Sequence, residues 1–121
     1  MDARLREGLR LFNAGRYFES HESLEDFYLT ADEEHRAFVE GLIQLAAACR
    51  LLCDFGEIKG PVRMIYQAII RIENYQPAHL GIRVKDLIEA MEGWAKKVEA
   101  DAGRVREPIP KIRTRRFIFL P

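Results

Sequence analysis

The segment over residues 31–54 constrains the fold more than any other part of the chain. Apolar side chains recur there at helical spacing, with one stripe through Phe38, Leu42 and Leu45, and the opposite side is apolar as well, for example at Ile43. A helix that is apolar on every side must be covered on every side. We therefore expect this segment to be the central helix of an all-α protein, and we expect part of its surface to be available to a partner chain.

Further segments show the same periodicity and are separated by short turns. Gly15 and Gly56 stand where helices are expected to end, Pro61 suits a first helical turn, and Thr30 with Glu33 resembles a capping box. A chain of 121 residues can form one domain with its own core. The expected fold is all-α, a single compact antiparallel bundle of about five helices that includes the whole chain, 1–121. The helices are predicted at about 2–14, 17–29, 31–54, 61–75 and 84–101, and an extended basic tail at about 104–121.

The tail differs from the body in charge. Residues 104–121 carry six basic side chains against the single acidic Glu107, although the net charge of the chain is zero, so the body is acidic. Pro108 and Pro110 preclude a helix, and residues 117–120 are apolar. We expect an extended segment that packs on the body. Because an acidic body repels a polyanion, we do not expect a nucleic-acid partner.

Composition also restricts the cellular setting. The sequence has no apolar run long enough to cross a membrane and no charged-then-apolar leader, so we expect a cytoplasmic protein without a membrane partner. Cys49 and Cys53 are four residues apart on one expected helix, where their Cβ atoms are poorly placed for a disulfide bond. Both are expected to be reduced core residues. His35 and His79 are expected at the surface.

The candidate site residues centre on the stretch YFESHESLE of the second expected helix. A projection at about 100° per residue places His21 and Glu25 on the apolar face and Glu22 at its edge. Glu40 and Gln44 lie one turn apart on the central helix. If the two helices pack together there, all five side chains meet in a polar pocket that faces into the bundle.

Two functions remain open for this cluster. In the first, hydrogen-bonded partners fix the register of two helices, because a buried charge without a partner costs several kcal/mol; the protein is then a non-enzymatic binding or assembly module without a cofactor, and its partner is a second copy or another protein. In the second, His21, Glu22 and Glu25 bind a divalent metal in a metal-dependent enzyme. His21 and Glu25 resemble part of the zincin helix, but Glu25 replaces its second histidine and no third ligand is indicated.

The stretch FNAGRYFESHESLEDFY followed by FVEGLIQLAAACR resembles the pattern of a prokaryotic domain-of-unknown-function family, the one numbered three hundred and nine. That pattern runs approximately F-N-x-G-x-[YF]-[FY]-E-x-H-E-x-L-E-x-x-W and then F-x-Q-G-L-I-Q-L-A-A, and the later YQPAHLGI extends the resemblance to about Trp94. Tyr28 stands where the family usually has Trp, and Glu40 where it often has Gln. The resemblance implies an all-helical fold and no established activity. The matching residues are Phe12, Asn13, Gly15, Glu19, His21, Glu22, Leu24, Glu25, Gly41, Gln44 and Leu45.

Overall fold

The computed structural model of the protein describes residues 1–101 and 108–115. The described chain is helical apart from its turns, one loop and an extended C-terminal segment, which confirms the all-α prediction. The predicted helices are all present, with ends displaced by only one or two residues at most boundaries. Their bounds are α1 (Ala3–Asn13), α2 (Tyr17–Thr30), α3 (Glu33–Phe55), α4 (Lys59–Ile72) with the short 3-10 helix η1 (Glu73–Tyr75), and α5 (Val84–Ala100).

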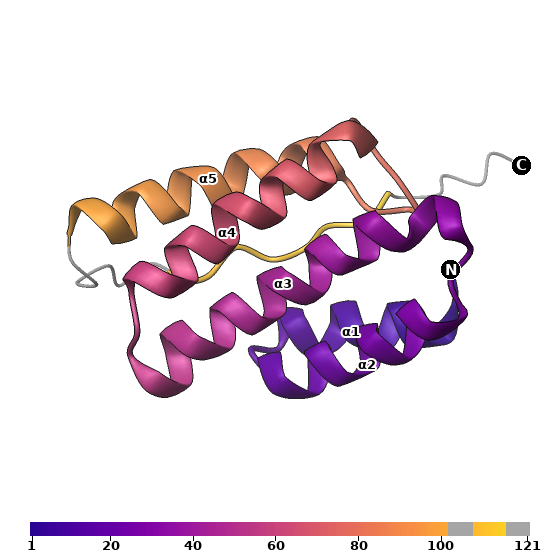
Figure 1. The fold of residues 1–121 in the computed structure, drawn as a ribbon, viewed down its shortest axis with the longest axis horizontal. Helices are drawn as coiled ribbons and strands as arrows, with labels where there is room; N and C mark the ends of the chain where they lie inside the picture. Colours follow the sequence, from indigo (N-terminus) through magenta and orange to yellow (C-terminus); the bar gives the residue numbers. More distant parts are fainter. Residues whose placement is uncertain (102–107, 116–121) are drawn as a thin grey trace, which may run out of the picture.

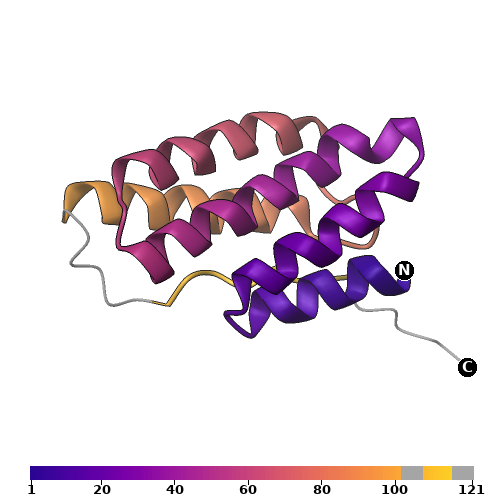
Figure 2. The same ribbon diagram turned by 60° about the horizontal axis from the view of Figure 1, so that its bottom comes forward.

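The central helix of the bundle is α3, as the sequence predicts (Figure 1). Helix α2 packs against one side of it and α4 against the other, while α1 pairs with α2 and α5 pairs with α4. Helices adjacent in sequence run antiparallel, which both views show (Figure 2). None of the described helices combines the length and the apolar character that crossing a membrane requires.

The turns agree with the sequence at the glycines but not at the predicted capping box. Gly15 and Gly56 both adopt the left-handed conformation, with φ of 77° and 65°, which a residue without a Cβ adopts at little cost. The capping box at Thr30 is wrong, because Thr30 still belongs to α2 and its hydroxyl donates to the Phe27 carbonyl. The N-cap of α3 is Asp32.

Helices α3 and α4 approach each other most closely at Gly41. A Cβ built on Gly41 would meet the Cγ2 atom of Ile72 well inside van der Waals contact and would lie 3.3 Å from the carbonyl oxygen of Ala68. The absence of a side chain at this position therefore sets the distance between the two helices.

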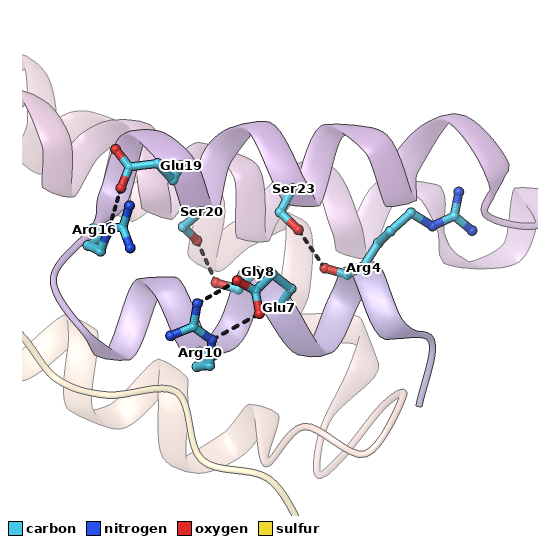
Figure 3. Close-up of polar contacts among 8 residues, drawn as sticks. All are labelled: Arg4, Glu7, Gly8, Arg10, Arg16, Glu19, Ser20 and Ser23. Carbon is cyan, nitrogen blue, oxygen red and sulfur yellow. Dashed lines mark hydrogen bonds and ion pairs between the residues drawn. The ribbon is translucent and has the colours of Figure 1, made fainter.

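The hairpin of α1 and α2 determines which side of α2 faces the core (Figure 3). The buried Ser20 hydroxyl donates to the Gly8 carbonyl at 2.7 Å, and the Ser23 hydroxyl donates to the Arg4 carbonyl at 2.8 Å. A Cβ built on Gly8 would lie only 2.7 Å from the Cδ2 atom of Leu24, so the two helices are in close contact. These contacts turn the Ser20 side of α2 toward α1.

The extended segment 108–115 lies between α1 and α5 (Figure 2). Ile112 of this segment is buried, and the Asn13 side chain at the end of α1 holds its backbone with two hydrogen bonds. The Asn13 Nδ2 donates to the Ile112 carbonyl at 2.9 Å, and the Ile112 N–H donates to the Asn13 Oδ1 at 2.7 Å. Packing of the tail on the body is thus confirmed for this segment, and the apolar residues 117–120 lie outside the described residues.

The two cysteines are free, in agreement with the sequence, but they differ in position. Cys49 is buried in the core, whereas Cys53 is exposed, so the prediction of a core position is wrong for Cys53. Cys53 lies in the last turn of α3, where residues 53–55 are all exposed.

Candidate functional site

The predicted polar cluster does not face into the bundle. The Glu25 side chain is 55% exposed and pairs with His21, whose Nε2 lies 3.6 Å from the Glu25 Oε1 and whose side chain is 28% exposed. Glu22 is exposed as well. The inward prediction is therefore wrong for Glu25, while His21 is half-buried at the edge of the α2 surface.

Glu25 is exposed because α2 turns a different face toward the core, one that includes the polar Ser20. Its buried residues are Tyr17, Ser20, Leu24 and Phe27, and on the helical projection the centre of this face is rotated by about 80° from the face that the sequence predicted. Apolar periodicity alone could not assign Ser20 to the core. Its small hydroxyl fits there because it donates to a backbone carbonyl of α1.

Three of the five predicted residues nevertheless come together. Glu25 of α2 and Glu40 and Gln44 of α3 line an open groove between α2, α3 and α4, with a volume of about 530 Å³. His21 and Glu22 are not among the residues that line this groove, and His21 adjoins it through its contact with Glu25. We call it the α2–α3–α4 groove. The other residues that line it are Tyr28, Leu29, Ile43 and Arg71.

Glu40 is the best-connected residue of the α2–α3–α4 groove. Its Oε1 accepts a hydrogen bond of 3.0 Å from the Tyr28 hydroxyl, and its Oε2 accepts one of 2.7 Å from the Arg71 guanidinium. The hydrogen bond to Glu40 raises the pKa of the Tyr28 hydroxyl, with burial as a further cause. The carboxylate at position 40 is thus balanced by Arg71, and it links α3 to both neighbouring helices.

Two acceptor groups of the groove differ in whether a ligand can reach them. The Gln44 amide nitrogen donates to the Gln67 side chain at 2.9 Å, whereas the Gln44 Oε1 is buried and accepts no hydrogen bond among the residues that the structure describes. The Glu25 carboxylate is exposed and contacts His21. The lining also includes Leu29, which is 74% exposed. The groove therefore presents a negative charge and an exposed apolar side chain.

A cationic side chain contacts two aromatic rings at the start of α2 and the end of α3, at the other end of these helices from the groove. The Arg50 guanidinium carbon is 4.2 Å from the centre of the Phe18 ring and 5.5 Å from that of Phe55. The two rings are 42% and 60% exposed, respectively. The Arg50 Nε lies 3.7 Å from Asp54 and makes no hydrogen bond within the described chain. We call Arg50, Phe18 and Phe55 the Arg50 cluster.

The structure also brings together two histidines that the sequence analysis did not relate to each other. The Nδ1 atom of His35, in the first turn of α3, lies 2.8 Å from the Nε2 atom of His79, in the loop before α5. The rings of Phe38 and Tyr75 pack against His79, with centres 4.9 and 4.6 Å from it. Burial, and next the charge of His35, lower the pKa of His79. No local signal relates histidines 44 residues apart, and the contacts indicate that they fasten the loop to α3.

The alternative metal set is not assembled as a group of three ligands. Within residues 1–101 and 108–115, the ligand atoms of three acidic, histidine or cysteine side chains come within 4.8 Å of one another at Asp32, Glu34 and His35. His21 and Glu25 form a pair that Glu22 does not complete. The described geometry therefore places Glu25, Glu40 and Gln44 in the α2–α3–α4 groove and does not bring Glu22 to the His21–Glu25 pair.

Comparison with known proteins identifies one family. Residues 5–64 match the family model described as "Domain of unknown function (DUF309)". This region spans most of α1, all of α2 and α3 and the first turns of α4, and it contains all five predicted site residues. No curated protein matches the chain in sequence.

Proposed function

The chain belongs to the DUF309 family, and we propose that it is a binding module whose α2–α3–α4 groove takes an organic cation carried on an apolar stem. The observation that carries this proposal is the groove itself, where the exposed Glu25 carboxylate and the exposed apolar side chain of Leu29 belong to the same lining. The Gln44 Oε1 is buried and out of reach of a ligand, so it is not one of the proposed contacts.

The charges of the groove favour a cation over other ligands. Its ionised residues are Glu25, Glu40 and Arg71, and the last two neutralise each other. The remaining charge is the negative one of Glu25, which would repel a carboxylate or phosphate. An ammonium or guanidinium group has donors only, so it complements the Glu25 carboxylate.

The apolar residues of the groove favour a ligand whose cationic group is attached to an aliphatic stem. Leu29 and Ile43 belong to the lining, and an aliphatic stem lying over them would gain at most about 0.8 kcal/mol for each methylene that leaves water. Four such groups contribute roughly 3 kcal/mol, and the exposed ion pair with Glu25 adds no more than about 1 kcal/mol. The sum of about 4 kcal/mol is an upper limit, so the dissociation constant for a small amine should be about 1 mM or weaker.

Weak binding of this kind is measurable by NMR. We expect n-butylammonium to shift the amide resonances of α2 and α3 around the groove, together with the Gln44 side-chain amide, and to saturate in the millimolar range. n-Butanol has the same stem without the charge, and it should bind several-fold more weakly. Equal shifts with the two compounds, or no saturable shift with the amine in monomeric protein, would refute the proposal.

Two matched variants locate the charge that matters. Glu25→Gln removes the carboxylate that lines the groove, and it should weaken n-butylammonium by roughly fivefold, the effect of about 1 kcal/mol. Glu22→Gln makes the same change of charge one turn away on the same helix and outside the lining. It should leave the affinity within about twofold. If the two variants lose the same affinity, the cation is attracted by the general charge of α2 and not by the groove.

A further inference from the structure

The protein itself displays a group of the kind that the groove fits. The Arg50 cluster holds a guanidinium between two exposed aromatic rings, on the same α2–α3 surface as the α2–α3–α4 groove. We propose that two copies of the chain form a symmetric dimer in which the Arg50 cluster of each copy enters the α2–α3–α4 groove of the other. This inference rests on the proposed function, because it names the occupant of the same groove.

The chemistry of the Arg50 cluster matches that of the groove. The partly exposed guanidinium group supplies donors and a positive charge for the exposed Glu25 carboxylate. Phe18 supplies the apolar surface that would cover Leu29. Arginine and aromatic side chains dominate the energy of many protein interfaces, since they bury large area and lose little conformational freedom.

The positions along α2 allow both contacts to form at once. Phe18 is seven residues from Glu25 and eleven from Leu29, which corresponds to about 10 and 16 Å along the helix. A two-fold axis that passes near Glu22, midway between them, places the Phe18 end of each α2 against the Glu25 and Leu29 end of its partner. The two exposed Glu22 carboxylates meet near the axis, and on either side of them the surface is self-complementary, as a symmetric dimer requires.

The exposure of α3 agrees with this arrangement. On the side of α3 between α2 and α4, the apolar Ile43 and Ala47 remain half-exposed. A helix with apolar residues on all sides is stable when each side is covered. The second copy supplies the cover that the described chain lacks there.

A charge exchange tests the dimer directly by sedimentation velocity. At about 100 µM, a concentration suited to a weak interface, the wild type should sediment as a dimer. Glu25→Arg and Arg50→Glu should each sediment as a monomer, since each places like charges together at both contacts. An equimolar mixture of the two variants should form dimers again, because every contact then joins an arginine to a glutamate. Glu89→Arg, an equal change of charge on the exposed surface of α5, should keep the mass of the wild type.

Other outcomes separate this inference from the groove itself. A wild type that is monomeric, or a mixture that stays monomeric although circular dichroism shows both variants folded, would overturn the dimer. If Arg50→Glu fails to fold, Phe18→Ser replaces it, and a dimeric Phe18→Ser would overturn the dimer as well. The proposed function has its own readout, since n-butylammonium should still bind a monomeric variant that retains Glu25. Failure of that binding in the presence of a charge-exchanged dimer would refute the small-cation proposal alone.

Discussion

Replacement of Gly41 by alanine should destabilise the bundle and with it the α2–α3–α4 groove. The new Cβ would overlap the Cγ2 atom of Ile72 and press on the Ala68 carbonyl. Ile72 is buried and β-branched, so it has little freedom to move away. Overpacking of this kind costs about 1–3 kcal/mol, whereas alanine in place of glycine in a helix gains about 0.5–1 kcal/mol. We expect a net loss of about 1 kcal/mol in the free energy of unfolding, and at most about 2.5 kcal/mol.

The matched control is Gly93→Ala in α5. A Cβ built there has open space around it, so this variant should show the helix-propensity gain alone, about 0.5–1 kcal/mol. For a chain of this size, 1 kcal/mol corresponds to about 4 °C in the melting temperature. Thermal unfolding followed by circular dichroism should therefore place Gly41→Ala below the wild type and Gly93→Ala above it. A Gly41→Ala variant that melts as high as Gly93→Ala would refute the inference that Gly41 sets the distance between α3 and α4.

Two further predictions concern the tail and the thiols. Asn13→Ala removes both hydrogen bonds to the Ile112 backbone, so the free energy of unfolding should fall by about 1–3 kcal/mol in urea denaturation; an unchanged midpoint would show that this contact does not hold the tail. Burial raises the pKa of the Cys49 thiol, so with Ellman's reagent at neutral pH the native protein should expose one reactive thiol, Cys53, and Cys53→Ser should abolish that reaction. Rapid labelling of native Cys53→Ser would contradict the burial of Cys49.

The helices could be predicted from the sequence because several signals agreed. Apolar periodicity defined their interiors, and Gly15 and Gly56 marked ends where the chain takes a left-handed turn. The error at Thr30 shows the limit of such signals. A threonine three residues before a glutamate can cap a helix, but here its hydroxyl bonds to the preceding turn of α2, and only the tertiary structure decides between the two.

The sequence correctly predicted that several residues of the candidate site meet, but it did not predict that they meet at the surface. Glu25, Glu40 and Gln44 do meet, as expected from packing of helices adjacent in sequence. Their exposure could not be predicted, because it depends on the burial of Ser20 against α1. Arg71 was missed for a different reason: it lies on α4, 31 residues after Glu40, and no local pattern relates the two side chains.

If the α2–α3–α4 groove takes an organic cation on an apolar stem, bound n-butylammonium must lie against the residues that line the groove. Intermolecular nuclear Overhauser effects can be measured between the methylene protons of n-butylammonium and methyl-labelled isoleucines in the monomeric Arg50→Glu variant. We expect contacts with the methyl groups of Ile43, which lines the groove, and none with those of Ile70, which is exposed on α4 but lies outside the lining. Contacts of equal strength at Ile43 and Ile70, or contacts at Ile70 alone, would contradict the account.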